Sequence, residues 1–247
     1  MTLSPGVADR APLATALRRS AHALADLVRQ APDPDAAVPG LSWTVSDVAA
    51  HALTVVRRSL GDLRRSASPL DTAALNATCL QELPERDLHA LADALAADAD
   101  TVVTRVLPSV PDDDRPVPFH GGTTARLLDA YGIMLAELLV HGHDIAAAGE
   151  QPWAIPPAEA ALAVQAVLAL APAWADPARW TDPATTLSIH VAGRRYDAQI
   201  GPDGTTMVGT PTTLPMLDPV EVLLALTGRG NSGDRAVRVL AESLLPL

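Results

Sequence analysis

The segment 131-YGIMLAELLVHGHDIAAAGE-150 is almost entirely apolar, yet it carries Glu137, His141 and His143 in its middle. Its residue types favour a helix, and a carboxylate buried among Leu and Val is costly unless it is paired. The fold must therefore bring polar partners or a cation against this helix. Glu137 and His141 are four residues apart and lie about 40° apart on one helix face, whereas His143 points to nearly the opposite side.

Aromatic side chains are scarce in the 247 residues, with one Phe, two Tyr and four Trp. Ala and Leu must therefore fill the core, which favours closely packed helices. The chain contains no Lys, and Ala, Pro, Gly and Arg are frequent. This bias is typical of a high-GC genome and predicts a high-GC bacterial source.

Apolar residues recur at helical spacing along most of the first 175 residues. Thr44 and Asp47 form the pattern of a capping box at the start of one of these helices. The segment 31–40 is predicted to be a loop, and 67–84 is ambiguous. The helices are predicted over residues 8–30, from 44 onward, about 85–107, about 122–148 and about 157–173.

The pattern changes after Trp180, where TLSIHVAGRRYDAQIG alternates apolar and polar residues. We expect a hairpin around Gly193, a short strand at Thr205–Val208, and helices near 219–228 and 233–245. Asp218 and Pro219 mark the start of the first of these helices. The fold class is therefore mainly α, with a helical-bundle domain over residues 1–175 and a small α+β domain over residues 176–247.

Charge and cysteine content exclude several classes of protein. The formal net charge is −11, and arginines occur as short pairs such as Arg57–Arg58 and Arg64–Arg65 without a basic stripe, which argues against nucleic acid as a partner. Cys79 is alone, so no internal disulfide can form, which fits a reducing cytoplasm. There is no signal-peptide pattern, and the apolar runs are short for a membrane span. We expect a cytoplasmic protein without a membrane partner, as a monomer or small homo-oligomer.

A second histidine-bearing helix can complete a metal site. His51 faces inward with Val48 and Val55, so two helices of a bundle can direct His51 and the Glu137/His141 pair at a shared interior. Two imidazoles and a carboxylate suit zinc, or ferrous iron, and three protein ligands leave a coordination position open. Alternatively, His51 is a hydrogen-bonded core residue.

The neighbours of this trio leave two further questions open. Asp144 lies three residues beyond His141 and can orient its ring by accepting the other N–H. Glu137, in contrast, can be satisfied without any metal by an arginine such as Arg126 or Arg57.

These residues carry a resemblance to a known family. The segments 41-LSWTVSDVAAHALTVVRRS-59 and 137-ELLVHGHDIAAAGE-150 contain Trp-Thr-Val-x-Asp-Val-x-x-His and Glu-x-x-x-His-Gly-x-Asp. This pattern resembles the mycothiol-dependent maleylpyruvate isomerase family, a DinB-like four-helix-bundle group of actinobacterial metalloenzymes. The segments TLSIHVAGRRYDAQI and PMLDPVEVLLALTGR are similar to the small sterol-carrier-like α+β domain of that family.

The resemblance implies a zinc site made by His51, Glu137 and His141. It also implies mycothiol as co-substrate, with its sulfur activated by the zinc. In the isomerase, the thiolate adds to a cis double bond, and rotation followed by elimination gives the trans isomer. A substrate carboxylate would be held by Arg229, which ends the sequence Leu-Thr-Gly-Arg.

The chain departs from the family pattern in places. His143 stands where the family often has an aromatic residue, and Ala52 stands where Leu is usual. The segment 60–120, which should form a wall of the pocket, matches no pattern of the family. The resemblance therefore supports the metal site better than it identifies a substrate, and S-transferases also belong to this superfamily.

Two rival functions stay open at this point. One is a metal-dependent hydrolase or lyase without thiol, in which Asp144 or His120 acts as the base. His120 lies in the loop PFHGG and can reach the mouth of the bundle as an acid or base, or be a plain turn residue. The other is a non-catalytic small-molecule binder without metal. Cys79 is expected to be a buried, inert thiol.

Overall fold

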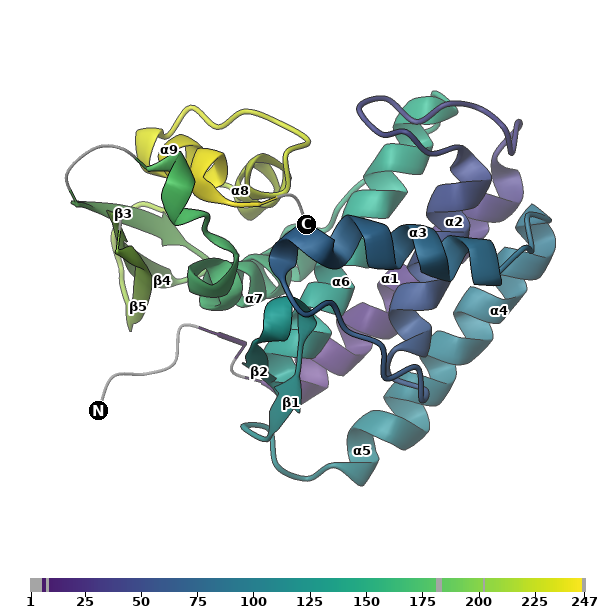
Figure 1. Cartoon of the computed structure of the whole chain (residues 1–247), viewed down its shortest axis with the longest axis horizontal. Helices are drawn as coiled ribbons and strands as arrows, with labels where there is room; N and C mark the ends of the chain where they lie inside the picture. The colour runs from purple at the N-terminus through teal and green to yellow at the C-terminus, as the bar shows by residue number, and fades with distance from the viewer. Residues whose placement is uncertain (1–5, 8, 181–183, 202, 246–247) are drawn as a thin grey trace.

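Most of the chain up to Trp174 is helical, as Figure 1 shows for this computed structural model. The structure describes residues 6–7, 9–180, 184–201 and 203–245. The helices of this part are α1 (Arg10–Gln30), α2 (Val45–Arg57), α3 (Thr72–Glu82), α4 (Leu88–Thr101), α5 (Leu107–Ser109), α6 (Leu127–Ala148) and α7 (Pro157–Trp174).

Helices α1, α2, α4 and α6 pack against one another as a bundle, and α7 covers another side of α6. Their inward faces consist mostly of Leu, Val and Ala, as the scarcity of aromatic residues requires. In α1, for example, Leu13, Leu17, Leu24 and Val28 recur at helical spacing and are buried. The predicted mainly α fold class is confirmed.

The predicted capping box fixes where α2 begins. Thr44 Oγ1 accepts a hydrogen bond from the Asp47 N–H at 3.2 Å, and Asp47 Oδ2 accepts one from the Thr44 N–H at 3.2 Å. Both bonds satisfy N–H groups that a helix start leaves unpaired. The register of α2 sets which of its side chains point into the bundle, and His51 is one of these.

The prediction of a helix from residue 122 was wrong at its start. Residues Thr124–Arg126 form a short strand, β2, which pairs antiparallel with β1 (Pro116–Pro118). Gly121 and Gly122 have φ values of +76° and +68°, in the left-handed region that favours glycine and interrupts a helix. Both of their N–H groups donate to Ser66 O, at 3.0 and 3.1 Å, which ties this loop to residue 66.

Two other helices also differ in extent from the prediction. The ambiguous segment 67–84 contains α3, which crosses the bundle in Figure 1. The helix expected over 85–107 begins at Leu88, because Asp87 caps it by accepting from the Ala90 N–H at 2.8 Å. It changes to a π-helical turn at Val102–Val106.

The C-terminal region contains a three-stranded antiparallel sheet in the order β3 (Thr185–Val191), β4 (Arg194–Gly201), β5 (Gly204–Pro211). The buried face of the predicted hairpin includes Ile189, which is paired with Tyr196. Helices α8 (Pro219–Leu226) and α9 (Arg235–Ser243) follow. The predicted N-cap is confirmed, since Asp218 accepts from the Val220 N–H at 2.9 Å. The division into residues 1–175 and 176–247 stays a prediction.

Helix α7 is the one described helix that is long and apolar enough to cross a membrane. More than half of it, 56%, is buried inside the protein, where it packs against α6 and α8. In this structure α7 therefore packs as a helix of the core. The cytoplasmic location stays a prediction.

The close approach of α6 and α7 gives a test of the packing. A Cβ on Gly132 would lie 2.5 Å from Ala166 Cβ and 2.9 Å from Val7 Cγ2. Helix propensity alone would favour Ala by about 1 kcal/mol, but the clash costs about 1–3 kcal/mol. Gly132→Ala should therefore lower the urea midpoint of unfolding. Gly233→Ala, which meets nothing within 4 Å, is the control. A Gly132→Ala midpoint at or above wild type would contradict this packing.

Candidate metal centre

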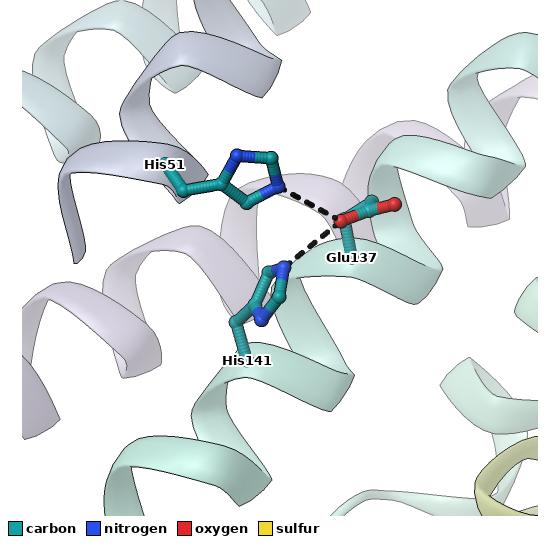
Figure 2. A group of neighbouring side chains, drawn as sticks. All are labelled: His51, Glu137 and His141. Atoms are coloured by element: carbon teal, nitrogen blue, oxygen red, sulfur yellow. Dashed lines mark hydrogen bonds and ion pairs between the residues drawn. The ribbon is translucent and has the colours of Figure 1, made fainter. Parts of the chain in front are cut away.

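Three side chains from two helices converge in the bundle, as Figure 2 shows. Glu137 Oε2 lies 3.0 Å from His141 Nε2 on the same helix, α6, and 3.5 Å from His51 Nε2 on α2. One potential ligand atom from each residue lies within 4.8 Å of the others. The structure thus brings together the three residues that the sequence predicted to meet.

The partners of Glu137 are these imidazoles and not an arginine. Its carboxylate is largely buried, with the side chain 18% exposed. Arg57 pairs with Asp98 at 2.9 Å, and Arg126 Nε bonds to Asp114 at 2.8 Å. The alternative that Glu137 is satisfied by Arg57 or Arg126 is therefore wrong.

A buried chain of ionic contacts extends from His141 to the C-terminal region. Asp144 Oδ2 lies 3.0 Å from His141 Nδ1, as the spacing of three residues predicted. Arg229, just beyond α8, donates to both oxygens of Asp144, at 3.2 and 3.0 Å, and to Thr227 O at 2.6 Å. When Nδ1 of His141 donates to Asp144, Nε2 is the nitrogen directed at Glu137.

The protonation states of the trio follow from burial and these contacts. Burial lowers the pKa of His51 to about 4, against the opposing effect of the hydrogen bond with Glu137. Burial also acts to lower the pKa of His141, but its bonds with Asp144 and Glu137 outweigh this and raise the pKa to about 9. For Glu137, burial acts to raise the pKa, yet the bonds with His141 and His51 hold it well below its usual value.

The donor set fits a divalent transition metal. At neutral pH without metal, His51 is neutral, Glu137 is ionised, and the proton on His141 supplies the positive charge between two carboxylates. A divalent cation can take over this charge, and two imidazole nitrogens with one carboxylate oxygen are ligands that zinc prefers. The buried Nδ1 of His51 has no hydrogen-bond partner among the described residues. The chemistry of the site therefore matches that of a three-ligand metal centre.

A cavity of about 380 Å³ adjoins the trio, and His51 and Glu137 form part of its wall. Apolar side chains such as Val55, Met134 and Phe119 make up much of the lining. About half of the lining residues lie in the ranges 58–76 and 117–120, and most of the others lie on α6. The segment 60–120 therefore contributes to the wall, as the resemblance led us to expect. A small molecule in this cavity can contact two of the three candidate ligands.

The structure places the other candidate residues as follows. His120 lines the cavity and is 5% exposed, so it is not a plain turn residue on the surface. Arg229 does not line this cavity, but it lines a separate recess of about 10 Å³ together with Glu137 and His141. Its predicted contact with substrate stays a prediction, as do the catalytic roles of Asp144 and His120. Cys79 is buried, as expected.

Sequence reasoning missed one neighbour of the trio and most of the cavity wall. Trp43, which precedes α2, packs against the His51 ring with centroids 4.8 Å apart. Arg58, Arg65 and Trp174 line the cavity. The paired arginines were noticed as a charge pattern, but nothing in their spacing pointed to a cavity.

The raised pKa of His141 predicts a pH dependence of stability in the chelator-treated protein. The folded pKa of about 9 exceeds the usual value of 6.5. The stabilisation is therefore fully present below pH 6.5 and is lost as pH rises towards 9. Asp144→Asn removes a charge that raises the pKa of His141. The urea midpoint of this variant should therefore fall less steeply over the same pH range than that of the wild-type protein. NMR titration of the His141 ring should show a lower pKa in Asp144→Asn, and an unchanged pKa would contradict the role given to Asp144.

A comparison with protein families identifies the helical part of the chain. The family described as mycothiol maleylpyruvate isomerase N-terminal domain matches residues 17–146, which is more than half of the 247-residue chain. The matched range contains His51, Glu137, His141 and Asp144, whereas Arg229 lies beyond it. No curated protein and no solved structure shows significant similarity to the chain. On the extent of this match, the chain belongs to the mycothiol maleylpyruvate isomerase N-terminal domain family.

Proposed function

We propose that this protein is a zinc-dependent enzyme that uses mycothiol as co-substrate. It acts as a cis–trans isomerase or S-transferase on a small electrophile that bears a carboxylate. The observation that carries the proposal is the convergence of His51, Glu137 and His141 beside a cavity, in a chain whose family is named for a mycothiol-using isomerase.

His51, Glu137 and His141 would hold the metal, and their chemistry supports this role. When bound, a zinc ion supplies positive charge that lowers the pKa of a thiol and favours the thiolate at neutral pH. Asp144 keeps the His141 ring in one orientation, and Arg229 keeps Asp144 in place. The apolar cavity wall would hold the electrophile near these residues and exclude water from it.

The surroundings of the candidate bases favour a thiol reaction over hydrolysis. A hydrolase needs a base with a free lone pair near the metal-bound water. Asp144 is 4% exposed and already bonds to His141 and Arg229. Nδ1 of His120 accepts a bond from the Ser66 N–H at 3.2 Å, and burial lowers the pKa of His120 to about 4. A thiol whose pKa is lowered below neutral pH releases its proton to solvent and needs no such base, because the thiolate is itself the nucleophile.

The first test of this function is metal content. Metal analysis of the purified protein should give close to one equivalent of zinc. Each of His51→Ala, Glu137→Gln and His141→Ala should reduce this to below about a tenth of an equivalent, because two ligands hold the ion poorly. Asp144→Asn should weaken metal affinity by about 10- to 100-fold. His190→Ala is the control, because His190 lies on β3 and is not one of the three candidate ligands. Wild-type protein that binds no transition metal would support the non-catalytic binder instead.

The second test is thiol dependence. With maleylpyruvate as the electrophile, conversion should require both mycothiol and metal, and a chelator should reduce the rate to background. Glu137→Gln should lower the rate by at least about 100-fold, as expected when the ion that activates the nucleophile is lost. Full turnover without thiol would exclude a thiol mechanism, and the hydrolase or lyase alternative would then stand.

A further inference from the structure

Three residues that line the cavity each carry a buried N–H group without an acceptor among the described residues. They are Arg58 Nε, His120 Nε2 and Trp174 Nε1, and all three atoms are buried without a hydrogen-bond partner among the described residues. Their residues come from the end of α2, the loop before β2 and the end of α7. Buried donors in proteins are almost always paired, so three unpaired donors in one cavity point to a ligand with oxygen acceptors.

The neighbours of His120 fix it as a donor. The main-chain N–H of Ser66 can only donate, and it points at Nδ1 of His120 at 3.2 Å. Burial and the charges of Arg58 and Arg65 lower the pKa of His120 to about 4, so the ring is neutral at pH 7. A neutral imidazole that accepts at Nδ1 carries its hydrogen on Nε2. Nε2 therefore needs an acceptor.

Trp174 and His120 flank the same aromatic ring in the cavity. The Phe119 ring is stacked on Trp174 with centroids 5.8 Å apart, and it meets the His120 ring edge-on at 5.7 Å. The indole N–H can only donate. These contacts hold two of the three donors in fixed positions on one part of the wall.

The two residues of each arginine pair, Arg57–Arg58 and Arg64–Arg65, have different surroundings. In each pair the first member meets a carboxylate: Arg57 pairs with Asp98, and Arg64 bonds to Asp62. The second members, Arg58 and Arg65, line the cavity.

The guanidinium groups that line the cavity bond to neutral atoms in the described part of the chain. Arg58 donates to the amide oxygen of Asn76 at 2.7 Å. Arg65 donates to the main-chain oxygens of Asp62, Arg64 and Arg58. Neither charge is neutralised by a hydrogen-bonded carboxylate.

The charge balance of the cavity favours an anion away from the metal centre. Glu137 is the one carboxylate among the described lining residues, and its bonds go to His51 and His141. The Asp62 carboxylate also acts on both arginine charges, but its hydrogen bonds go to Arg64. Arg58 and Arg65 therefore have no carboxylate as a hydrogen-bond partner in the described part of the chain. Hydrogen bonds from a guanidinium to a carboxylate are stronger than those between neutral groups.

We propose that Arg58, His120 and Trp174 form a subsite that binds a carboxylate of the molecule occupying the cavity. This proposal rests on the proposed function, in which the electrophilic substrate occupies the cavity. The carboxylate is therefore that of the substrate. The subsite would place the reacting double bond between this carboxylate and the thiol held near Glu137. Arg229, which already bonds to Asp144, then serves as a positioning residue and does not hold the substrate.

The test measures binding of maleate to the full-length protein by calorimetry, without any thiol. Arg58→Gln removes the charge, and Trp174→Phe removes the N–H while keeping a ring beside Phe119. His120→Asn removes the Nε2 donor, and its amide oxygen can still accept from Ser66. Arg57→Gln is the matched control on the same helix, outside the cavity lining.

Wild-type protein should bind maleate at least about tenfold more tightly than the uncharged dimethyl maleate. Arg58→Gln should weaken maleate binding by about tenfold or more, and Trp174→Phe and His120→Asn by about two- to tenfold each. Arg57→Gln should bind like wild type. The losses should be the same in protein as purified and in chelator-treated protein, since the subsite does not depend on the metal.

The subsite is overturned if maleate binds no better than its ester. It is also overturned if Trp174→Phe and Arg58→Gln, both folded by circular dichroism, bind maleate like wild type. Binding that disappears on chelation, with Arg58→Gln unchanged, would place the anion at the metal and overturn it too. The two proposals can fail separately. If Arg58→Gln loses maleate binding but the wild-type protein shows no thiol-dependent turnover, the subsite is supported and the proposed function is rejected.

Discussion

Glu137 lies on α6, one of the most apolar helices of the chain, and its carboxylate needs partners because burial penalises an isolated charge. The two imidazoles that meet it come from α6 itself and from α2. The contact between His51 and Glu137 joins α2 to α6, and the capping box fixes where α2 begins. His141 also contacts Asp144, and Asp144 accepts from Arg229, so each of these ionised groups has an opposite charge beside it. The interior of the bundle therefore contains a group of paired polar side chains among its apolar ones.

Much of this arrangement could be predicted from the sequence because it rests on local spacing. The interval of four between Glu137 and His141 fixes their shared face, and the interval of three places Asp144 beside the same ring. The position of His51 follows from the apolar neighbours in its helix and from the cap at Thr44. Family resemblance selected the same three residues and was confirmed by the match over residues 17–146.

The cavity could not be predicted in the same way, because its wall comes from contacts between distant segments. His120 receives its hydrogen bond from Ser66, which is 54 residues earlier. No periodic pattern links these residues, and the left-handed glycines at 121 and 122 precede a strand where the sequence suggested the start of a helix. Arg58 and Arg65 look like ordinary surface charges until the chain is folded. Local spacing thus predicted the candidate metal centre, while contacts between distant segments decide what adjoins it.

The bond between Arg229 and Asp144 joins the region after the sheet to a residue that itself contacts a candidate ligand. Replacing groups near Arg229 can change how strongly Asp144 polarises His141 while every ligand stays the same. A substitution in the region that follows the sheet can therefore alter the surroundings of His141 from a distance of 85 residues along the chain, as between Asp144 and Arg229.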